Sequence, residues 1–383
     1  MIDHLVVGLV AAATTALITP SVGWLARRLG AVRWRAGEGS AQRTVAAGDA
    51  SRQAMSLARR DRRVPVLGGL AMFGGFLAAL VVAAPRDAFA DLFATTSEPV
   101  AVLAGVAAIV AVGMLDDLLD LSAALKLAGQ LVAATLVAAL GLQLQYFWLP
   151  SIGIVALSDD LGLVLTVIFL VAFINLVNLA DGLDGLASGV VGIGAVAFLL
   201  YALRGGGTAA GLLSSATLLA TVTVGVAAGF LVHNWYPARI FMGDTGSMLL
   251  GLLLGSAGVA HVGRSSSPDA AELIASVPLV VPVVVLAVPV VDTVVTIVRR
   301  LLHDLPVTRA DLGHLHHALV APGRSHRAAV IVLYGWSVAA GLAVVGPLYL
   351  PSGTVLVLLV SLVLVMSVAT VVGLRSRSAP VAR

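Results

Sequence analysis

The sequence has no cysteine and very little charge. Of its 383 residues only 11% are charged and 5% are aromatic, and a single residue, Lys126, is lysine. The absence of cysteine excludes disulfides, thiolate metal sites and cysteine nucleophiles. The scarcity of charge excludes an ordinary soluble domain, in which about 25% of residues are charged.

Hydrophobic residues instead make up 59% of the chain and run almost from end to end. A membrane-spanning helix needs about 20 consecutive apolar residues. By this criterion we expect eleven spans, approximately at 2–22, 64–84, 99–115, 123–143, 161–180, 186–203, 209–232, 247–263, 271–298, 328–349 and 353–373. The sequence therefore predicts an all-α, polytopic integral membrane protein that forms one domain over residues 1–383.

The basic residues lie almost entirely on one side of these spans. Of the 23 Lys and Arg residues, 20 fall on one side and 3 on the other, and the basic side normally faces the cytoplasm. We therefore expect an external N-terminus, a cytoplasmic C-terminus and a location in the plasma membrane. The expected cytoplasmic segments are the loops 23–63 and 299–327 and the tail 374–383. A net charge of +3 distributed in this way indicates topology rather than nucleic-acid binding.

Two further expectations concern the N-terminal part of the chain. The first span has no basic residue before it and is followed by Arg27 and Arg28, a pattern typical of an anchor rather than a cleaved signal peptide. Residues 36–63 are rich in Arg, Ala, Ser and Gly, a composition that predicts a flexible insert.

The first polar cluster is the segment GMLDDLLDL, in which Asp116, Asp117 and Asp120 lie within five residues. Carboxylates this close repel one another unless a cation or a shared proton lies between them. Lys126 follows in the next span, where a compact ammonium would face these aspartates or a phosphate. The alternatives are a polar loop that merely ends a helix and a lysine that only compensates charge.

The second polar cluster is the segment INLVNLADGLDGLASG. Asn175, Asn178, Asp181 and Asp184 recur at every third residue and form a stripe at the cytoplasmic end of an apolar helix. Amides and carboxylates within a span usually mark a ligand or ion path, although capping and turn chemistry would explain a single Asp-Gly step. The outer side has only scattered aspartates, which we expect in ordinary connecting loops: Asp87, Asp91, Asp159, Asp160 and Asp269.

Two more polar segments fall on the same predicted cytoplasmic side. In HNWYPARIFMGDTGS, Asp244 lies in a short glycine loop, and we expect Ser247 to cap the helix that follows. An aspartate at a helix N-terminus suits Mg²⁺ that bridges a diphosphate, and a plain Asx turn is the alternative. His314, His316 and His317 lie among arginines and indicate phosphate recognition rather than a zinc site.

These segments, taken in order, resemble the polyprenyl-phosphate N-acetylhexosamine-1-phosphate transferase family. The resemblance rests on VPVLGGLAMFGG, LDDLLDL, NLVNLADGLDGLASG, HNWYPARIFMGDTGS, PVVDT and HLHH, between about Val64 and Tyr334. It implies transfer of a sugar 1-phosphate from a UDP-sugar to a polyprenyl phosphate, release of UMP, and a requirement for Mg²⁺, with Mn²⁺ as the alternative ion. HLHH resembles the branch that uses UDP-N-acetylglucosamine or a related UDP-N-acetylhexosamine; the phospho-N-acetylmuramoyl-pentapeptide transferases are the alternative.

The resemblance also implies roles for individual residues. It implies a catalytic set that comprises Asp116, Asp117, Lys126, Asp184, His314, His316 and His317. Of these, Asp116 and Asp117 would lie at the lipid phosphate. It implies a set around the nucleotide and cofactor of Asn178, Asp181, Asn234 and Ser247, with Asp244 as the metal ligand. The expected partners are the UDP-N-acetylhexosamine, the polyprenyl phosphate lipid and the membrane, with a homodimer as one assembly state.

The chain also departs from the family pattern at three positions. Val66, Leu312 and Ala318 stand where the family usually has basic residues, which affects the grip on substrate more than the metal site. Two rival interpretations belong to other classes. A transporter or flippase would use the intramembrane Asp292 and the stripe from Asn175 to Asp184 as its path, and a scaffold paralogue would have no activity.

Overall fold

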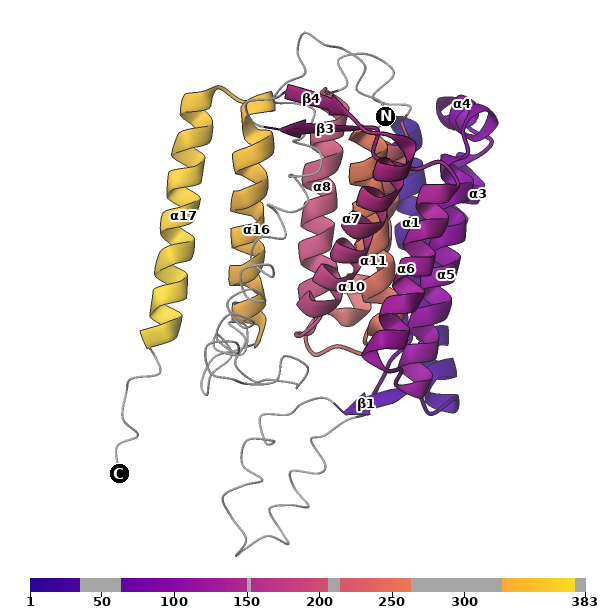
Figure 1. Ribbon diagram of the computed structural model, residues 1–383. Coiled ribbons are helices and arrows are strands. Elements are labelled where there is room, and N and C mark those ends of the chain that lie inside the picture. The colour runs from indigo at the N-terminus through magenta and orange to yellow at the C-terminus, as the bar shows by residue number, and fades with distance from the viewer. Residues whose placement is uncertain (35–62, 150–152, 206–213, 263–325, 376–383) are drawn as a thin grey trace, which may run out of the picture.

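The computed structural model describes residues 1–34, 63–149, 153–205, 214–262 and 326–375, most of which form long helices in one bundle (Figure 1). The long helices are α1 (Ile2–Arg28), α3 (Gly68–Ala83), α5 (Glu98–Leu119), α6 (Ala123–Ala139), α7 (Asp159–Ala180), α8 (Leu186–Gly205), α10 (Ser215–Asn234), α11 (Gly243–Val262), α16 (His326–Tyr349) and α17 (Ser352–Arg375). A short helix, α4 (Asp87–Thr95), follows α3.

The prediction of a multi-span helical membrane protein is confirmed in its coarse form. Seven of the described helices are long and apolar enough to cross a membrane, and α3 with α4, bent by 100°, would make an eighth. Ten of the eleven predicted spans overlap a helix, and the span at 271–298 lies outside the described residues. The count of eleven and the orientation stay predictions.

The all-α prediction needs a correction, because two antiparallel hairpins accompany the helices. Strand β1 (Val32–Trp34) pairs with β2 (Arg63–Pro65), and β3 (Tyr146–Leu149) pairs with β4 (Gly153–Ala156). Both hairpins are too short to stand out from the apolar background of the sequence. Residues 23–28, predicted as loop, continue α1, and most of the predicted insert, residues 35–62, lies outside the described residues.

The prediction of plain loops on the outer side was also wrong for four aspartates. Asp87 and Asp91 belong to α4, and Asp159 and Asp160 form the first turn of α7. Helix α4 forms because its apolar residues recur on one face, where Phe89 and Leu92 are buried. Carboxylates in the first turn of a helix are favoured by the helix dipole.

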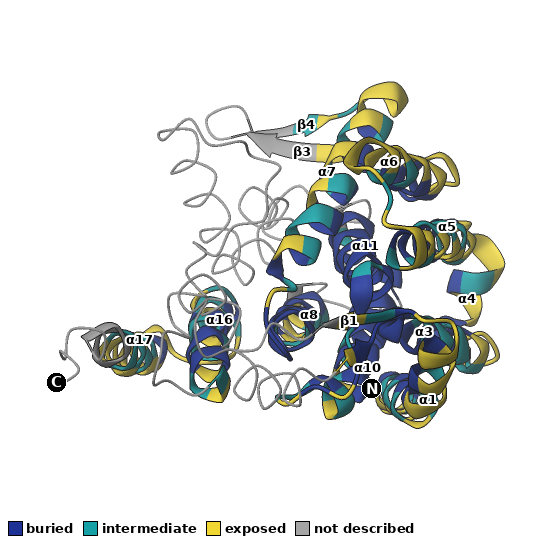
Figure 2. Ribbon diagram, turned by 90° about the horizontal axis from the view of Figure 1, so that it is seen from below, coloured by how far each residue is buried: buried dark blue, intermediate teal, exposed yellow. Residues whose placement is uncertain are grey.

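Helices α10 and α11 lie at the centre of the bundle, whereas α17 lies at its edge (Figure 2). In their apolar windows, 78% of the residues of α10 are buried but only 6% of those of α17. The difference comes from small residues: a side chain on Gly225 or Gly229 of α10 would collide with the backbone of α1 at Gly8 or Ala12. Such small residues let membrane helices approach closely, and α17 instead presents large apolar side chains outward.

The helix ends that carry the polar motifs meet at one end of the bundle. This end holds the last turns of α1, α5, α7 and α10, the first turns of α3, α6 and α11, and the hairpin of β1 and β2 (Figure 1). The opposite end holds the N-terminus, α4 and the hairpin of β3 and β4 (Figure 1). The motifs of the sequence are therefore neighbours in space.

Candidate active site

Four polar side chains from four helices meet at this end of the bundle. Lys126 of α6 donates hydrogen bonds from Nζ to Asp244 Oδ2 at 2.7 Å and to Asp116 Oδ2 at 3.3 Å. The same ammonium lies 3.4 Å from Asn178 Oδ1, and Asn178 Nδ2 donates to Asp244 Oδ1 at 2.5 Å. We call Asp116, Lys126, Asn178 and Asp244 the charged cluster.

The charged cluster is shielded from solvent but not sealed. The side chains of Lys126 and Asp244 are each 17% exposed, and that of Asp116 is 6% exposed. One ammonium between two carboxylates leaves a net negative charge, which favours a further cation nearby. Lys126 can exchange a carboxylate for a phosphate oxygen, and Asp116 or Asp244 can exchange the ammonium for a metal ion. Neither exchange requires a change in the backbone.

Asp117, the neighbour of Asp116 in the chain, lies in a different environment. Its Oδ1 accepts from the backbone N–H of Asp244 at 3.0 Å, and its Oδ2 accepts from the N–H and the hydroxyl of Thr245 at 3.1 and 2.7 Å. Arg33 Nη2 adds a contact at 3.4 Å to a carboxylate whose side chain is fully buried. Asp117 therefore caps the N-terminus of α11, where N–H groups lack partners within the helix.

This cap corrects the role predicted for Ser247. A cap at Ser247 would start helix α11 at Met248, whereas the helix begins five residues earlier, at Gly243. Inside the helix, Ser247 Oγ donates to Gly243 O at 3.1 Å and accepts from Asn178 at 2.8 Å. Gly243 has a φ of +69°, and a side chain there would collide with the carboxylate of Asp117. Glycine is thus required at this position by both conformation and space.

The glycines of the VPVLGG segment hold the start of α11 from another side. Gly68 N and Gly69 N donate to Phe241 O and Met242 O at 3.0 and 2.9 Å. A side chain on Gly69 would collide with the backbone of Thr245. Val66, at the position where the family usually has a basic residue, is only 1% exposed, so a charge there would be buried in this chain.

A second group of polar contacts joins two loops beside the charged cluster. Asp184 Oδ2 accepts from Ala238 N at 2.9 Å. Asn234 Oδ1 accepts from Gly185 N at 3.0 Å, and its Nδ2 donates to Ile240 O at 3.0 Å. We call these five residues the loop tie. Asn234 is only 2% exposed, and both its amide oxygen and its amide nitrogen bind backbone groups. Asn234 therefore links the two loops structurally.

Helix α16 supports the loop tie from outside. The hydroxyl of Tyr334 donates to Gly185 O, and Arg327 Nε donates to Tyr236 O at 3.1 Å. The ring of His326 stacks on that of Tyr236 with centroids 4.4 Å apart. This contact was not predictable, because the sequence of α16 is that of a plain apolar span.

Asp181 lies at the end of α7, half-buried and close to both groups. Burial raises its pKa to about 7, and repulsion from Asp244 and Asp117 adds to this rise while Arg33 opposes it. A carboxyl with such a pKa changes its charge near neutral pH, which is a property often found at functional sites.

The structure brings together eight of the twelve predicted site residues from separate segments, and a ninth, Asp181, lies among them. His314, His316 and His317, like Asp292, lie outside the described residues. Sequence reasoning missed Thr245, Arg33 and Gln130. Only Gln130 carried a signal, as a lone amide one helical turn from Lys126 in an apolar span.

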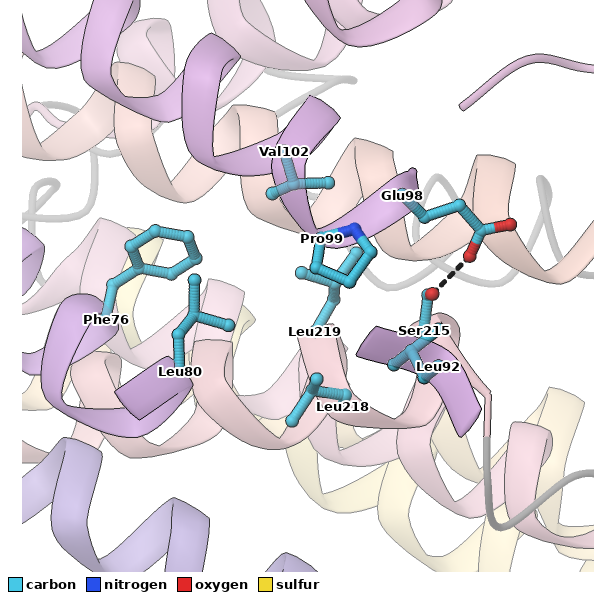
Figure 3. A pocket seen from close by; sticks show the side chains of 9 residues that line it. All are labelled: Phe76, Leu80, Leu92, Glu98, Pro99, Val102, Ser215, Leu218 and Leu219. Carbon is cyan, nitrogen blue, oxygen red and sulfur yellow. Dashed lines mark hydrogen bonds between the residues drawn. The ribbon is translucent and has the colours of Figure 1, made fainter. Parts of the chain in front are cut away.

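A crevice at the opposite end of the bundle, beside α4, is lined mainly by apolar side chains (Figure 3). Its lining combines Phe76, Leu80, Leu92, Pro99, Val102, Leu218 and Leu219 with the hydrogen-bonded pair of Glu98 and Ser215. Its one carboxylate, Glu98, accepts a hydrogen bond from Ser215, and no basic side chain of the described residues lines the crevice, so the candidate site stays at the polar end.

Comparisons with known proteins find related sequences over most of this chain. The family model "Glycosyl transferase family 4" matches residues 99–262, the stretch that supplies all four members of the charged cluster. A Mycobacterium tuberculosis decaprenyl-phosphate N-acetylglucosaminephosphotransferase is 34% identical over 345 residues, which cover 86% of this chain and 79% of the relative.

Two further relatives carry related names. A probable undecaprenyl-phosphate N-acetylglucosaminyl 1-phosphate transferase of Bacillus subtilis is 31% identical over 334 residues, 87% of this chain and 82% of the relative. A phospho-N-acetylmuramoyl-pentapeptide-transferase of Desulforudis audaxviator is 32% identical over 304 residues, 74% of this chain and 83% of the relative.

Proposed function

Since the chain belongs to glycosyl transferase family 4, as its motifs predicted, we propose that it transfers N-acetylglucosamine 1-phosphate from UDP-N-acetylglucosamine to a polyprenyl phosphate. The products are the lipid-linked sugar diphosphate and UMP. The observation that carries this proposal is the charged cluster, which joins two carboxylates, an ammonium and an amide at the helix ends. There a membrane lipid and a soluble nucleotide can meet.

The proposed reaction is a displacement at phosphorus. An oxygen of the lipid phosphate attacks the β-phosphorus of the UDP-sugar, the bond from that phosphorus to the bridging oxygen breaks, and UMP leaves with that oxygen. Lys126 is suited to stabilise the charge that develops on the transferring phosphoryl group. Once it binds phosphate, its ammonium gives up one of its two carboxylates.

Of the two adjacent aspartates, we assign Asp116 to the lipid phosphate. Asp116 Oδ1 accepts from Leu121 N at 2.9 Å, but its Oδ2 accepts from the Lys126 ammonium and the side chain keeps 6% exposure. The carboxylate of Asp117 is instead fully buried at the start of α11. A base, or a nucleophile in a double displacement, must reach the substrate. Asp117 would instead act by holding Asp244 in place.

The residues present fit Mg²⁺. This ion takes one or two carboxylates and leaves its other positions to phosphate oxygens and water. Asp244 and Asp116 offer carboxylate oxygens on either side of Lys126. Among the described residues no group of three or more His, Asp or Glu side chains is arranged to hold a metal alone, so the substrate would complete the site. When bound, the ion neutralises charge on the diphosphate.

We place the site on the cytoplasmic face of the plasma membrane. Arg27, Arg28, Arg33 and Arg63 lie at the same end of the bundle as the charged cluster, and arginine is concentrated on the cytoplasmic side of membrane proteins. UDP-sugars are made in that compartment, so the donor reaches this face directly.

The test is UMP release by the purified protein in detergent. UDP-N-acetylglucosamine with polyprenyl phosphate should release UMP, and omission of the lipid or chelation of Mg²⁺ should stop the release. UDP-N-acetylmuramoyl-pentapeptide is the second donor, because one relative carries the name of that transferase. Release from the second donor alone would move the chain to that branch.

Two other outcomes would overturn the proposal. No UMP from either donor would favour a scaffold or a transporter. Exchange of labelled UMP into UDP-N-acetylglucosamine without any lipid would indicate a double displacement through an aspartyl phosphate in place of the direct attack.

A further inference from the structure

A pair of amides, one buried and one half-buried, lies one helical turn deeper than the charged cluster. Asn175 Nδ2 of α7 donates to Gln130 Oε1 of α6 at 2.6 Å, and Gln130 Nε2 lies 3.3 Å from Asn175 Oδ1. Gln130 is only 1% exposed, and its amide nitrogen also contacts Met248 Sδ of α11 at 3.4 Å. The two side chains therefore pair with each other across the helices.

Such a pair is not the most stable choice for this place. Amides lose their hydration on burial, and hydrogen bonds between membrane helices return only part of that loss. Apolar side chains of the same size would fill the contact between α6 and α7 equally well. The pair instead constrains how α6 and α7 pack. Its two reciprocal hydrogen bonds form at only one axial position and one rotation of the two helices.

That setting decides whether the charged cluster can form. Gln130 follows Lys126 by four residues on α6, and Asn175 precedes Asn178 by three on α7. At these spacings each amide shares a helix face with a member of the cluster. The contact of Lys126 with Asn178 at 3.4 Å thus lies directly over the amide pair.

We propose that Gln130 and Asn175 are positioning residues that fix α6 against α7, so that the Lys126 ammonium reaches Asp244. The expected effect on kcat rests on the proposed function, whereas the expected effect on the packing of α6 against α7 does not. Neither amide touches the reacting groups, and both act through the residues one turn above them.

The kinetic test replaces both amides together by apolar side chains of similar size, in the double variant Gln130→Met with Asn175→Leu. We expect kcat for UMP release to fall about 10- to 100-fold, the loss typical of a small misplacement, while both KM values change little. The melting temperature should stay equal or rise, because the apolar pair is at least as stable. A residue that merely supports the fold would lower kcat and melting temperature together.

The double swap Gln130→Asn with Asn175→Gln should restore most of kcat, because it keeps both amides and their summed length. Thr223→Val is the matched control: this buried hydroxyl of α10 bonds only to Leu219 O in its own helix, so kcat should not change. Unchanged kcat in the double apolar variant, or a swap no more active than that variant, would overturn the inference.

A second readout works even if the protein releases no UMP. The chain has no cysteine, so spin labels can be attached at Leu125→Cys on α6 and Val164→Cys on α7, both exposed. A rise of 1.5 Å per residue puts them about 20 Å apart along the bundle. We expect a narrow distance distribution that broadens with Gln130→Met. An unchanged distribution would overturn the inference and leave the proposed function intact.

Discussion

The charged cluster and the loop tie lie side by side, yet their polar groups are satisfied in opposite ways. In the charged cluster the contacts between members join side chains: Lys126 holds two carboxylates and Asn178 holds one of them, and Asp116 Oδ1 in addition accepts from Leu121 N. In the loop tie side chains bind backbone: Asp184 holds Ala238 N, and Asn234 holds Gly185 N and Ile240 O.

The difference separates side chains that can bind a substrate from side chains that stabilise the fold. A side chain that leaves another side chain only changes its rotamer, so the charged cluster can take up a phosphate or a cation. A side chain that leaves a buried backbone group strands an unpaired N–H or C=O. Substitutions in the first group should therefore remove activity, and those in the second should lower stability.

The largest loss should come from Asp244→Asn. The variant keeps the size and one of the two acceptor oxygens but removes the charge that Lys126 and a metal ion need, so we expect UMP release to fall about 1000-fold. The melting temperature should change little. A variant that unfolds instead would show that Asp244 belongs with the loop tie.

Lys126→Met should reduce kcat about 100-fold or more, because the positive charge near the phosphoryl group is lost. Binding of Mn²⁺, measured by electron paramagnetic resonance, should not weaken, since the ammonium and the ion compete for the oxygens of Asp244. Weaker Mn²⁺ binding would contradict the competition between lysine and metal.

Asn234→Leu tests the other side of the comparison. It leaves Gly185 N and Ile240 O buried without their partner, at a cost of about 1–3 kcal/mol for each group. Thermal denaturation in detergent should show a clear fall in melting temperature, whereas KM for the UDP-sugar should change little. A raised KM without a loss of stability would instead indicate that Asn234 contacts the nucleotide.

Asp181 lies between the two regions and should show the smallest effect. Its pKa of about 7 lies above the ordinary value of 3.8, so the folded protein binds this proton more tightly than the unfolded chain does. The stability contributed by the proton is complete below pH 3.8 and is lost as the pH rises through about 7.

The measurement compares melting temperatures of the unmodified protein and Asp181→Asn, both without metal, from about pH 5 to about pH 8. The unmodified protein should lose stability relative to the variant across this range and then level off. Parallel curves would show that Asp181 keeps an ordinary pKa.

Much of the fold followed from the sequence because apolar length alone identifies a membrane helix. The sequence did not reveal the hairpins or α4, which are too short to alter a 20-residue average. Helix α4 did carry a local signal, since Phe89, Leu92 and Phe93 recur at helical spacing.

The site was predictable as a set of residues but not as a set of contacts. Spacing grouped the aspartates correctly, yet it could not tell Asp116, which faces Lys126, from Asp117, which caps α11. The cap was assigned to Ser247 because capping rules use only local sequence, whereas the carboxylate that fills this role comes from another helix. Which neighbours meet is decided by helix packing.

The most direct test of the central claim follows the β-phosphate of the donor. UDP-N-acetylglucosamine labelled with ³²P at that phosphate is incubated with the purified protein, polyprenyl phosphate and Mg²⁺, beside Asp244→Asn. If the charged cluster performs sugar-phosphate transfer, the label moves into the lipid with the unmodified protein only, and unlabelled UMP is released. Label that leaves as UDP, or that stays in the donor, would contradict the account.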